Sequence, residues 1–76
     1  MLLTNEERAT IIDNLLEQKD RKIAWLQRVT ELNYNTVHNV ATGAGKNKPR
    51  KSTIKAIATA LGIEPVELVA KQDDNL

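Results

Sequence analysis

Short stretches of helical periodicity, each bounded by residues that start or stop helices, constrain this chain more than any other feature. The first stretch contains Ile11, Ile12, Leu15 and Leu16, at spacings that place them on one face of a helix. Shorter stretches of the same kind recur as far as residue 69. With 76 residues and no cysteine, the chain is too short for two independent cores. We therefore predict one compact all-α domain over residues 1–76, built from five helices.

The first helix has the clearest start signal. Thr4 is followed three residues later by Glu7, the pattern of a capping box, in which each side chain bonds to the backbone of the other residue. Leu3 precedes the cap and is placed to pack against the first turn. We expect this helix to end near Lys19.

The other helix boundaries follow from single residues. Asp20, Asn33 and Ser52 are predicted N-caps of the second, third and fourth helices, because each carries a short side-chain acceptor. Gly43 and Gly62 are predicted to end the third and fourth helices in the left-handed conformation. These signals place a helix-turn-helix unit at about residues 22–43.

Pro65 is well suited to the first position of a short fifth helix, whose apolar residues are Val66, Leu68 and Val69. The tail, residues 71–76, is expected to fray. The predicted core consists of the inward apolar positions of all five helices: Ile11, Leu15, Ile23, Leu26, Leu32, Val37, Val40, Ile54, Ile57, Leu61, Ile63 and Val66.

Charge is divided sharply along the chain, although the total is only +1. Residues 19–55 hold nine basic and two acidic side chains, whereas the segments before and after each hold one basic and four acidic ones. Such a division suits a protein that holds a polyanion on one face, and chance variation in surface charge is the alternative. The segment 44–51 is polar and basic, which predicts an exposed loop.

The segment from Leu26 to Gly43 resembles the helix-turn-helix of the lambda-repressor-like, or Cro-type, family. The resemblance covers about residues 11–69 and rests on the aliphatic, cap and glycine positions Leu26, Leu32, Asn33, Val37, Val40 and Gly43. Two residues depart from the family pattern: Gln27 replaces the usual alanine of the first helix, and Glu31 replaces the glycine of the turn, which has positive φ.

This resemblance implies a sequence-specific DNA-binding regulator whose second helix enters the major groove. Asn35 and Asn39 are the first candidates for reading bases, because an amide side chain matches the N6 and N7 edge of adenine. Tyr34 and His38 are the next candidates, and a merely polar helix surface is the alternative.

Phosphate binding requires cations and amide donors on both sides of the reading helix. The candidates are Arg21, Lys22, Asn33, Lys46, Lys48, Arg50 and Lys51. A basic loop that is only solvated remains the alternative for the last four.

The expected partners are double-stranded operator DNA and a second copy of the chain, because one short helix reads few base pairs. The self-contact implied by the family is the C-terminal segment with Val66, Leu68 and Val69. We expect a repressor. Two alternatives are a protein-binding adaptor or antirepressor that keeps the fold, which Gln27 and Glu31 leave open, and a nonspecific DNA-packaging protein.

Several functions find no support in the sequence. His38 is the only histidine and there is no cysteine, so we predict no metal site, no cofactor, no small-molecule ligand and no enzymatic activity. The N-terminus lacks the pattern of a signal peptide and no apolar run is long enough for a membrane span. We expect a protein of the bacterial cytoplasm or nucleoid. For Trp25 we expect partial burial in the core, against the first helix or the loop, with exposure at a partner surface as the alternative.

Overall fold

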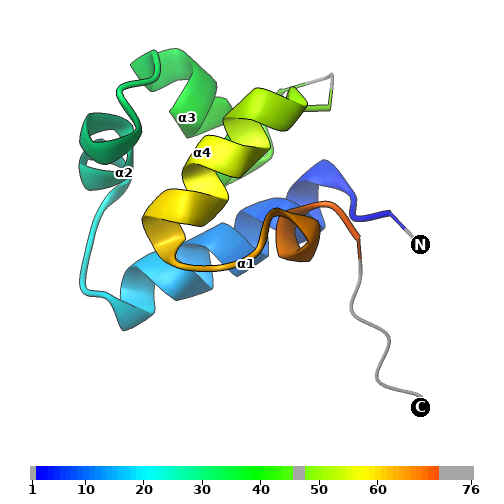
Figure 1. Cartoon of the computed structure of the whole chain (residues 1–76), viewed down its shortest axis with the longest axis horizontal. Helices are drawn as coiled ribbons and strands as arrows, with labels where there is room; N and C mark the ends of the chain where they lie inside the picture. Colours follow the sequence, from blue (N-terminus) through cyan, green and yellow to red (C-terminus); the bar gives the residue numbers. More distant parts are fainter. Residues whose placement is uncertain (1, 46–47, 71–76) are drawn as a thin grey trace.

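A computed structural model describes residues 2–45 and 48–70, which form four α-helices and one short 3₁₀ helix (Figure 1). Their bounds are α1 Asn5–Gln18, α2 Ile23–Thr30, α3 Tyr34–Thr42, α4 Lys51–Leu61 and η1 Pro65–Leu68. The all-α prediction is confirmed in these ranges, but the fifth predicted helix is only four residues of 3₁₀ helix. So short a segment cannot offset the cost of nucleating an α-helix.

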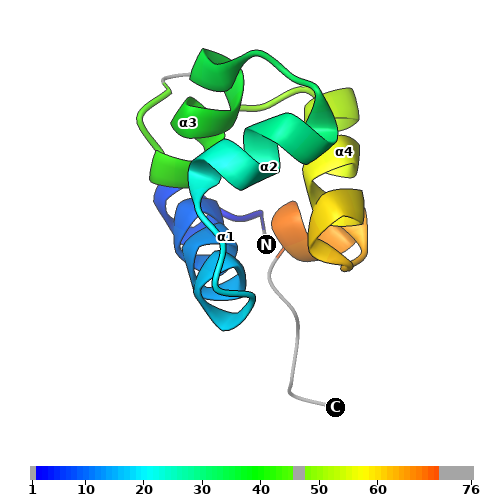
Figure 2. The same cartoon turned by 90° about the vertical axis from the view of Figure 1, so that its left-hand side faces the viewer.

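The helices enclose one core. Helix α3 packs against α1 and α2, α2 also contacts α4, and η1 packs against α4 (Figure 2). The two ends of the described chain meet, because the Leu3 N–H donates to the Val69 carbonyl at 2.9 Å and Leu2 pairs with Ala70 in an antiparallel bridge. Among residues 2–45 and 48–70, no helix is long and apolar enough to cross a membrane.

The predicted capping box of α1 is confirmed. The Thr4 hydroxyl accepts from the Glu7 N–H at 3.1 Å, and the Thr4 N–H donates to the Glu7 carboxylate at 2.9 Å. Asn33, Gly43 and Gly62 also cap as predicted: the Asn33 side chain accepts from the Asn35 N–H, and both glycines have positive φ.

Two predicted caps are wrong. Asp20 does not begin α2 but takes a left-handed conformation (φ 55°) after α1, and Lys22 is the N-cap. Ser52 lies inside α4, whose N-cap is Arg50, because the Arg50 carbonyl already accepts the Ile54 N–H at 3.0 Å. Both corrections place a cation at the start of a helix.

Most predicted core residues are buried or packed against the core. The fully buried centre contains Ile12, Leu26, Val37, Ile57, Leu61 and Leu68. In α1 the deepest positions are Ile12 and Leu16, while Ile11 and Leu15 lie at the edge of the core.

Val66 is the one predicted core residue that is wrong, because it is 56% exposed. A 3₁₀ helix repeats every three residues, so Leu68 shares the inner face with Pro65, and Val66 shares the outer face with Val69. Leu68 therefore fills the chain's own core and is not available for a self-contact.

Candidate nucleic-acid interface

The turn between α2 and α3 keeps a tight geometry despite its two unusual residues. Glu31 has φ 58° and ψ 22°, the left-handed conformation that glycine adopts most easily. Its N–H donates to the Gln27 carbonyl at 3.0 Å, and the Gln27 side-chain amide donates to the Leu32 carbonyl at 2.9 Å. The long Gln27 side chain thus bridges the turn and holds the two helices in place.

Helix α3 presents a polar outer face because its apolar residues are all turned inward. Val37, Val40 and Ala41 are buried, while Asn35 and Asn39 lie on the exposed side. A helix of this kind can enter a groove about 12 Å wide without moving its own core contacts.

Tyr34 and His38 lie on one flank of α3. Their rings stack with centroids 5.8 Å apart and planes inclined by 29°. Tyr34 is 48% exposed and His38 is partly buried. Tyr34 also lines a shallow concavity of about 470 Å³ together with the cations Arg21 and Lys22 and the α1 carboxylates Asp13 and Glu17. This flank therefore joins α3 to the start of α2.

The N-terminus of α2 is cationic and open. Arg21 and its N-cap Lys22 are both exposed, and among the described residues no side chain caps this helix. The Arg21 guanidinium lies 5.5 Å from the centroid of the Trp25 ring, within the range of a cation–π contact. Trp25 itself is partly buried and packs against the core.

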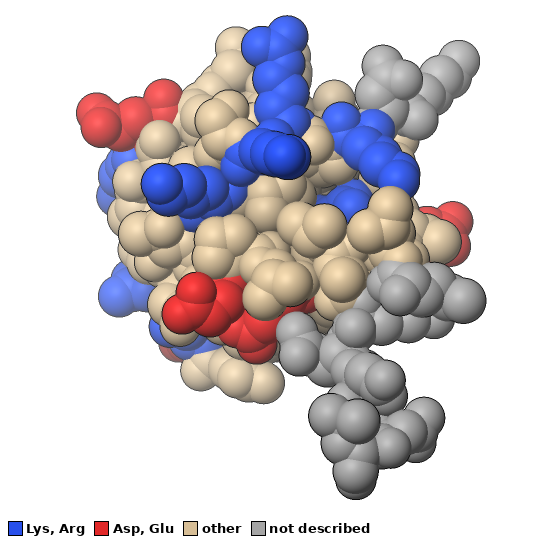
Figure 3. Space-filling model, turned by 45° about the vertical axis from the view of Figure 1, so that its right-hand side comes forward, with Lys and Arg blue, Asp and Glu red and all other residues tan. Residues whose placement is uncertain are grey.

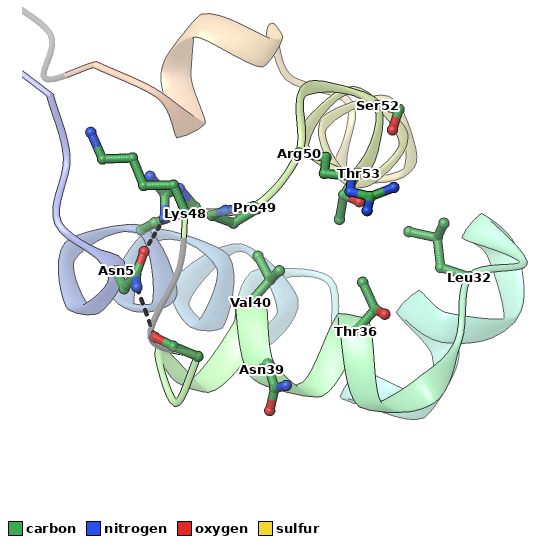
Figure 4. Close-up of a pocket in the computed structure, with 12 residues that line it drawn as sticks. Asn5, Leu32, Thr36, Asn39, Val40, Lys48, Pro49, Arg50, Ser52 and Thr53 are labelled. Atoms are coloured by element: carbon green, nitrogen blue, oxygen red, sulfur yellow. Dashed lines mark hydrogen bonds between the residues drawn. The ribbon is translucent and has the colours of Figure 1, made fainter.

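The opposite flank of α3 forms a groove of about 620 Å³ with the start of α4 (Figure 4). Thr36 and Val40 point from α3 toward Arg50 and Thr53, whereas the Asn39 amide is directed away from α4 (Figure 4). Lys48 lies at the end of the groove near Asn5 (Figure 4).

The N-terminus of α4 is also cationic and open. Within residues 2–45 and 48–70 it has no side-chain cap and no acidic residue in its first turn. Arg50, Lys48 and Lys51 are exposed around it, and Lys and Arg side chains gather in the upper half of the face in Figure 3. The free backbone N–H groups and the helix dipole favour an anion here.

The structure therefore brings most predicted residues together around α3. Tyr34, Asn35, His38 and Asn39 lie on its outer side, and Arg21, Lys22, Lys48 and Arg50 line the concavities on its two flanks. Lys51 lies in the first turn of α4 but does not line the groove, Asn33 is engaged in capping α3, and Lys46 lies outside the described residues.

Sequence reasoning missed the hydroxyl groups of the groove. Thr36, Ser52 and Thr53 line it, and Thr53 is buried to 7% exposure. Thr36 precedes Asn39 by three residues, so a helical wheel alone places the two on neighbouring positions. In contrast, no signal in the sequence pairs Thr36 with Thr53. No group of three His, Cys, Asp or Glu side chains arranged for a metal occurs in the part of the chain that the structure describes.

Comparison with known families agrees with this geometry. A model of the Cro/C1-type helix-turn-helix DNA-binding domain matches residues 12–74, which is most of the chain. No curated protein and no solved structure matches the chain. The chain belongs to the Cro/C1-type helix-turn-helix DNA-binding domain family.

Proposed function

We propose that this protein is a sequence-specific transcription regulator that represses by occupying an operator. The observation that supports this most is the pairing of one polar helix face with an open cationic helix end on each flank. A helix that lies in the major groove of DNA faces the edges of the bases, and a phosphate backbone runs along each side of it.

In this proposal α3 lies in the major groove. Asn35 and Asn39 pair their amides with adenine edges, and Tyr34 packs against a thymine methyl group or hydrogen-bonds to a base. His38 supports Tyr34 through the ring stack and lies close enough to share its contact. Thr36 adds a hydroxyl donor on the side of α4.

The two flanks bind the two phosphate backbones. Arg21 and Lys22, with the free N–H groups of α2, hold one backbone, and Lys48, Arg50 and Lys51, with the start of α4, hold the other. Asn33 and Lys46 are additional candidates next to α3 and in the loop that follows it.

We further propose that the protein binds a palindromic site as a homodimer. Val66 of η1 and Val69, which directly follows that helix, are exposed, so a second copy can cover them. Two reading helices about 34 Å apart would then meet successive turns of the major groove. Light scattering of the protein with bound DNA tests this, and a 1:1 complex would contradict it.

Gln27 and Glu31, which depart from the family pattern, are the basis of the alternative that the protein is an adaptor that no longer recognises a DNA sequence. Both residues are accommodated within an intact turn, so neither favours that alternative over DNA binding.

Selection of purified protein on randomised DNA duplexes tests the function. We expect an enriched inverted repeat, and a plot of log K against log salt with a slope near −7 for about eight phosphate contacts per dimer. Retention without enrichment would support nonspecific packaging, and no retention at moderate salt would support the adaptor.

A further inference from the structure

Arg8 is the most deeply buried charged side chain in the described part of the chain, with 4% exposure. Its Nε donates to the Leu68 carbonyl at 2.7 Å, and its terminal nitrogens donate to the Leu3 carbonyl at 3.4 Å and to the Asn5 side-chain oxygen at 2.8 Å. All three acceptors are neutral oxygens, and burial lowers the pKa of Arg8. A guanidinium held in this way fixes the relative positions of the groups that surround it.

Asn5 extends this network to the segment that follows α3. Its side-chain oxygen accepts from Arg8, and its side-chain N–H donates to the Gly45 carbonyl at 2.9 Å (Figure 4). The hydrogen bonds thus run from η1, through the first turn of α1, to the segment that leaves α3. Leu68 and Gly45 are 60 and 40 residues from their partners in the sequence.

The first turn of α1 also packs closely on the end of α3. A Cβ atom at Gly43 would lie 3.1 Å from the Asn5 carbonyl oxygen, which is closer than side chains normally approach. The backbone of Asn5 and its side chain therefore contact Gly43 and Gly45 respectively. The chain leaving α3 is fixed at two points by one residue.

Asn5 also lines the groove beside α4. Gly45, Lys48 and Arg50 line it as well. Lys48 is only three residues beyond Gly45 in the sequence, so fixing Gly45 limits the positions that Lys48 can reach. This connection is the link between the buried network and the DNA-facing surface.

We propose that Asn5 is a positioning residue for phosphate binding: by holding Gly45, it places Lys48 and Arg50 at the groove. The inference rests on the proposed function. The amide side chain of Asn5 accepts from Arg8 and donates to Gly45 at the same time, whereas a carboxylate can only accept.

The test compares Asn5→Asp with Thr4→Asp. The Asn5→Asp variant keeps an acceptor for Arg8 and gains a favourable charge in the first turn of α1, and these gains should offset the lost hydrogen bond to Gly45 and keep the protein folded. It loses the donor to Gly45. The Thr4→Asp variant adds the same charge one residue earlier and retains a good N-cap and the Asn5 amide.

Binding to the selected operator duplex is measured by fluorescence anisotropy over a range of salt concentrations. We expect Asn5→Asp to bind at least about 10-fold more weakly than Thr4→Asp, with a salt slope shallower by about 3.6, because two phosphate contacts are lost in each copy of the dimer. Equal affinity and equal slope for the two variants would overturn the proposal while leaving DNA binding intact.

A second measurement covers the case in which the wild type does not bind DNA, which would refute the proposed function instead. The Ala44 N–H donates to the Asn39 carbonyl at 3.2 Å, next to the tethered Gly45. Its hydrogen exchange should accelerate in Asn5→Asp relative to Thr4→Asp. Unchanged exchange would overturn the positioning role on its own.

Discussion

The N-termini of four of the five helices fall into two groups that differ in charge and in capping, while α3 is capped by the neutral Asn33 side chain. Those of α1 and η1 are closed by capping boxes, with Glu7 and Glu67 reaching back to the chain. Those of α2 and α4 begin at Lys22 and Arg50 and, in residues 2–45 and 48–70, receive no side-chain cap.

This difference separates stability from binding. A closed, acidic N-terminus satisfies its own backbone donors and complements the dipole, so it stabilises the fold. An open, cationic N-terminus lacks this stabilisation, and its positive charge is also repelled by the positive end of the helix dipole. The open ends are the two that flank α3, so their free donors remain available to a ligand of negative charge.

Converting an open end into a closed one should have the largest effect. Arg50→Asp gives α4 an acidic N-cap, so the free energy of unfolding should rise by about 1 kcal/mol. The same change should weaken operator binding about 100-fold, because a cation and the free amides are lost together. Thermal melting and anisotropy check the two effects. Unchanged binding by this variant would show that the open end of α4 does not contact DNA.

The helix between the two open ends should behave differently from either. Asn39→Ala is expected to weaken binding to the selected operator by about 1–3 kcal/mol and to leave the salt slope unchanged, because base reading involves no phosphate. Competition between operator and random duplexes measures this. A comparable loss on random DNA would assign Asn39 to the backbone instead of the bases.

Opening a closed end should affect stability alone. Thr4→Ala removes one half of the α1 capping box, which should cost about 1 kcal/mol and lower the melting temperature by about 4–8 °C. Operator affinity measured well below the melting temperature should not change. Loss of affinity in the folded variant would mean that the closed ends also contribute to binding.

The smallest effect is expected at the other end of α2. Glu31→Gly relieves a left-handed conformation, at a cost in chain entropy, and removes a negative charge from a helix C-terminus. The net gain should be about 0.5 kcal/mol in the free energy of unfolding, with no change in DNA binding. Denaturant titration detects it, and a loss of stability would indicate that the Glu31 side chain has a favourable contact.

Features that depend on neighbouring residues were predictable from the sequence. The Thr4 box, the Asn33 cap and the Gly43 stop each involve positions a few residues apart, and they place α1 and α3 correctly. The polar face of α3 follows from the spacing of Val37 and Val40.

Features that depend on contacts between distant segments could not be predicted from the sequence. The contact of Asn5 with Gly45 joins residues 40 positions apart, and no local pattern encodes it. Val66 was misplaced because α and 3₁₀ helices orient the same residues differently. Lys22 and Arg50 were predicted to bind phosphate but not to be N-caps, since a cap that is missing leaves no signal in the sequence.

The contact between Arg21 and Trp25 gives the protein a built-in optical reporter. Trp25 is the single tryptophan of the chain, and the cation over its ring is one that the proposed function assigns to a phosphate. In that case the Arg21 guanidinium would contact either the Trp25 ring or a DNA phosphate. Any movement of Arg21 from one to the other would alter the surroundings of the indole, so intrinsic fluorescence would follow the engagement of α2 without a label.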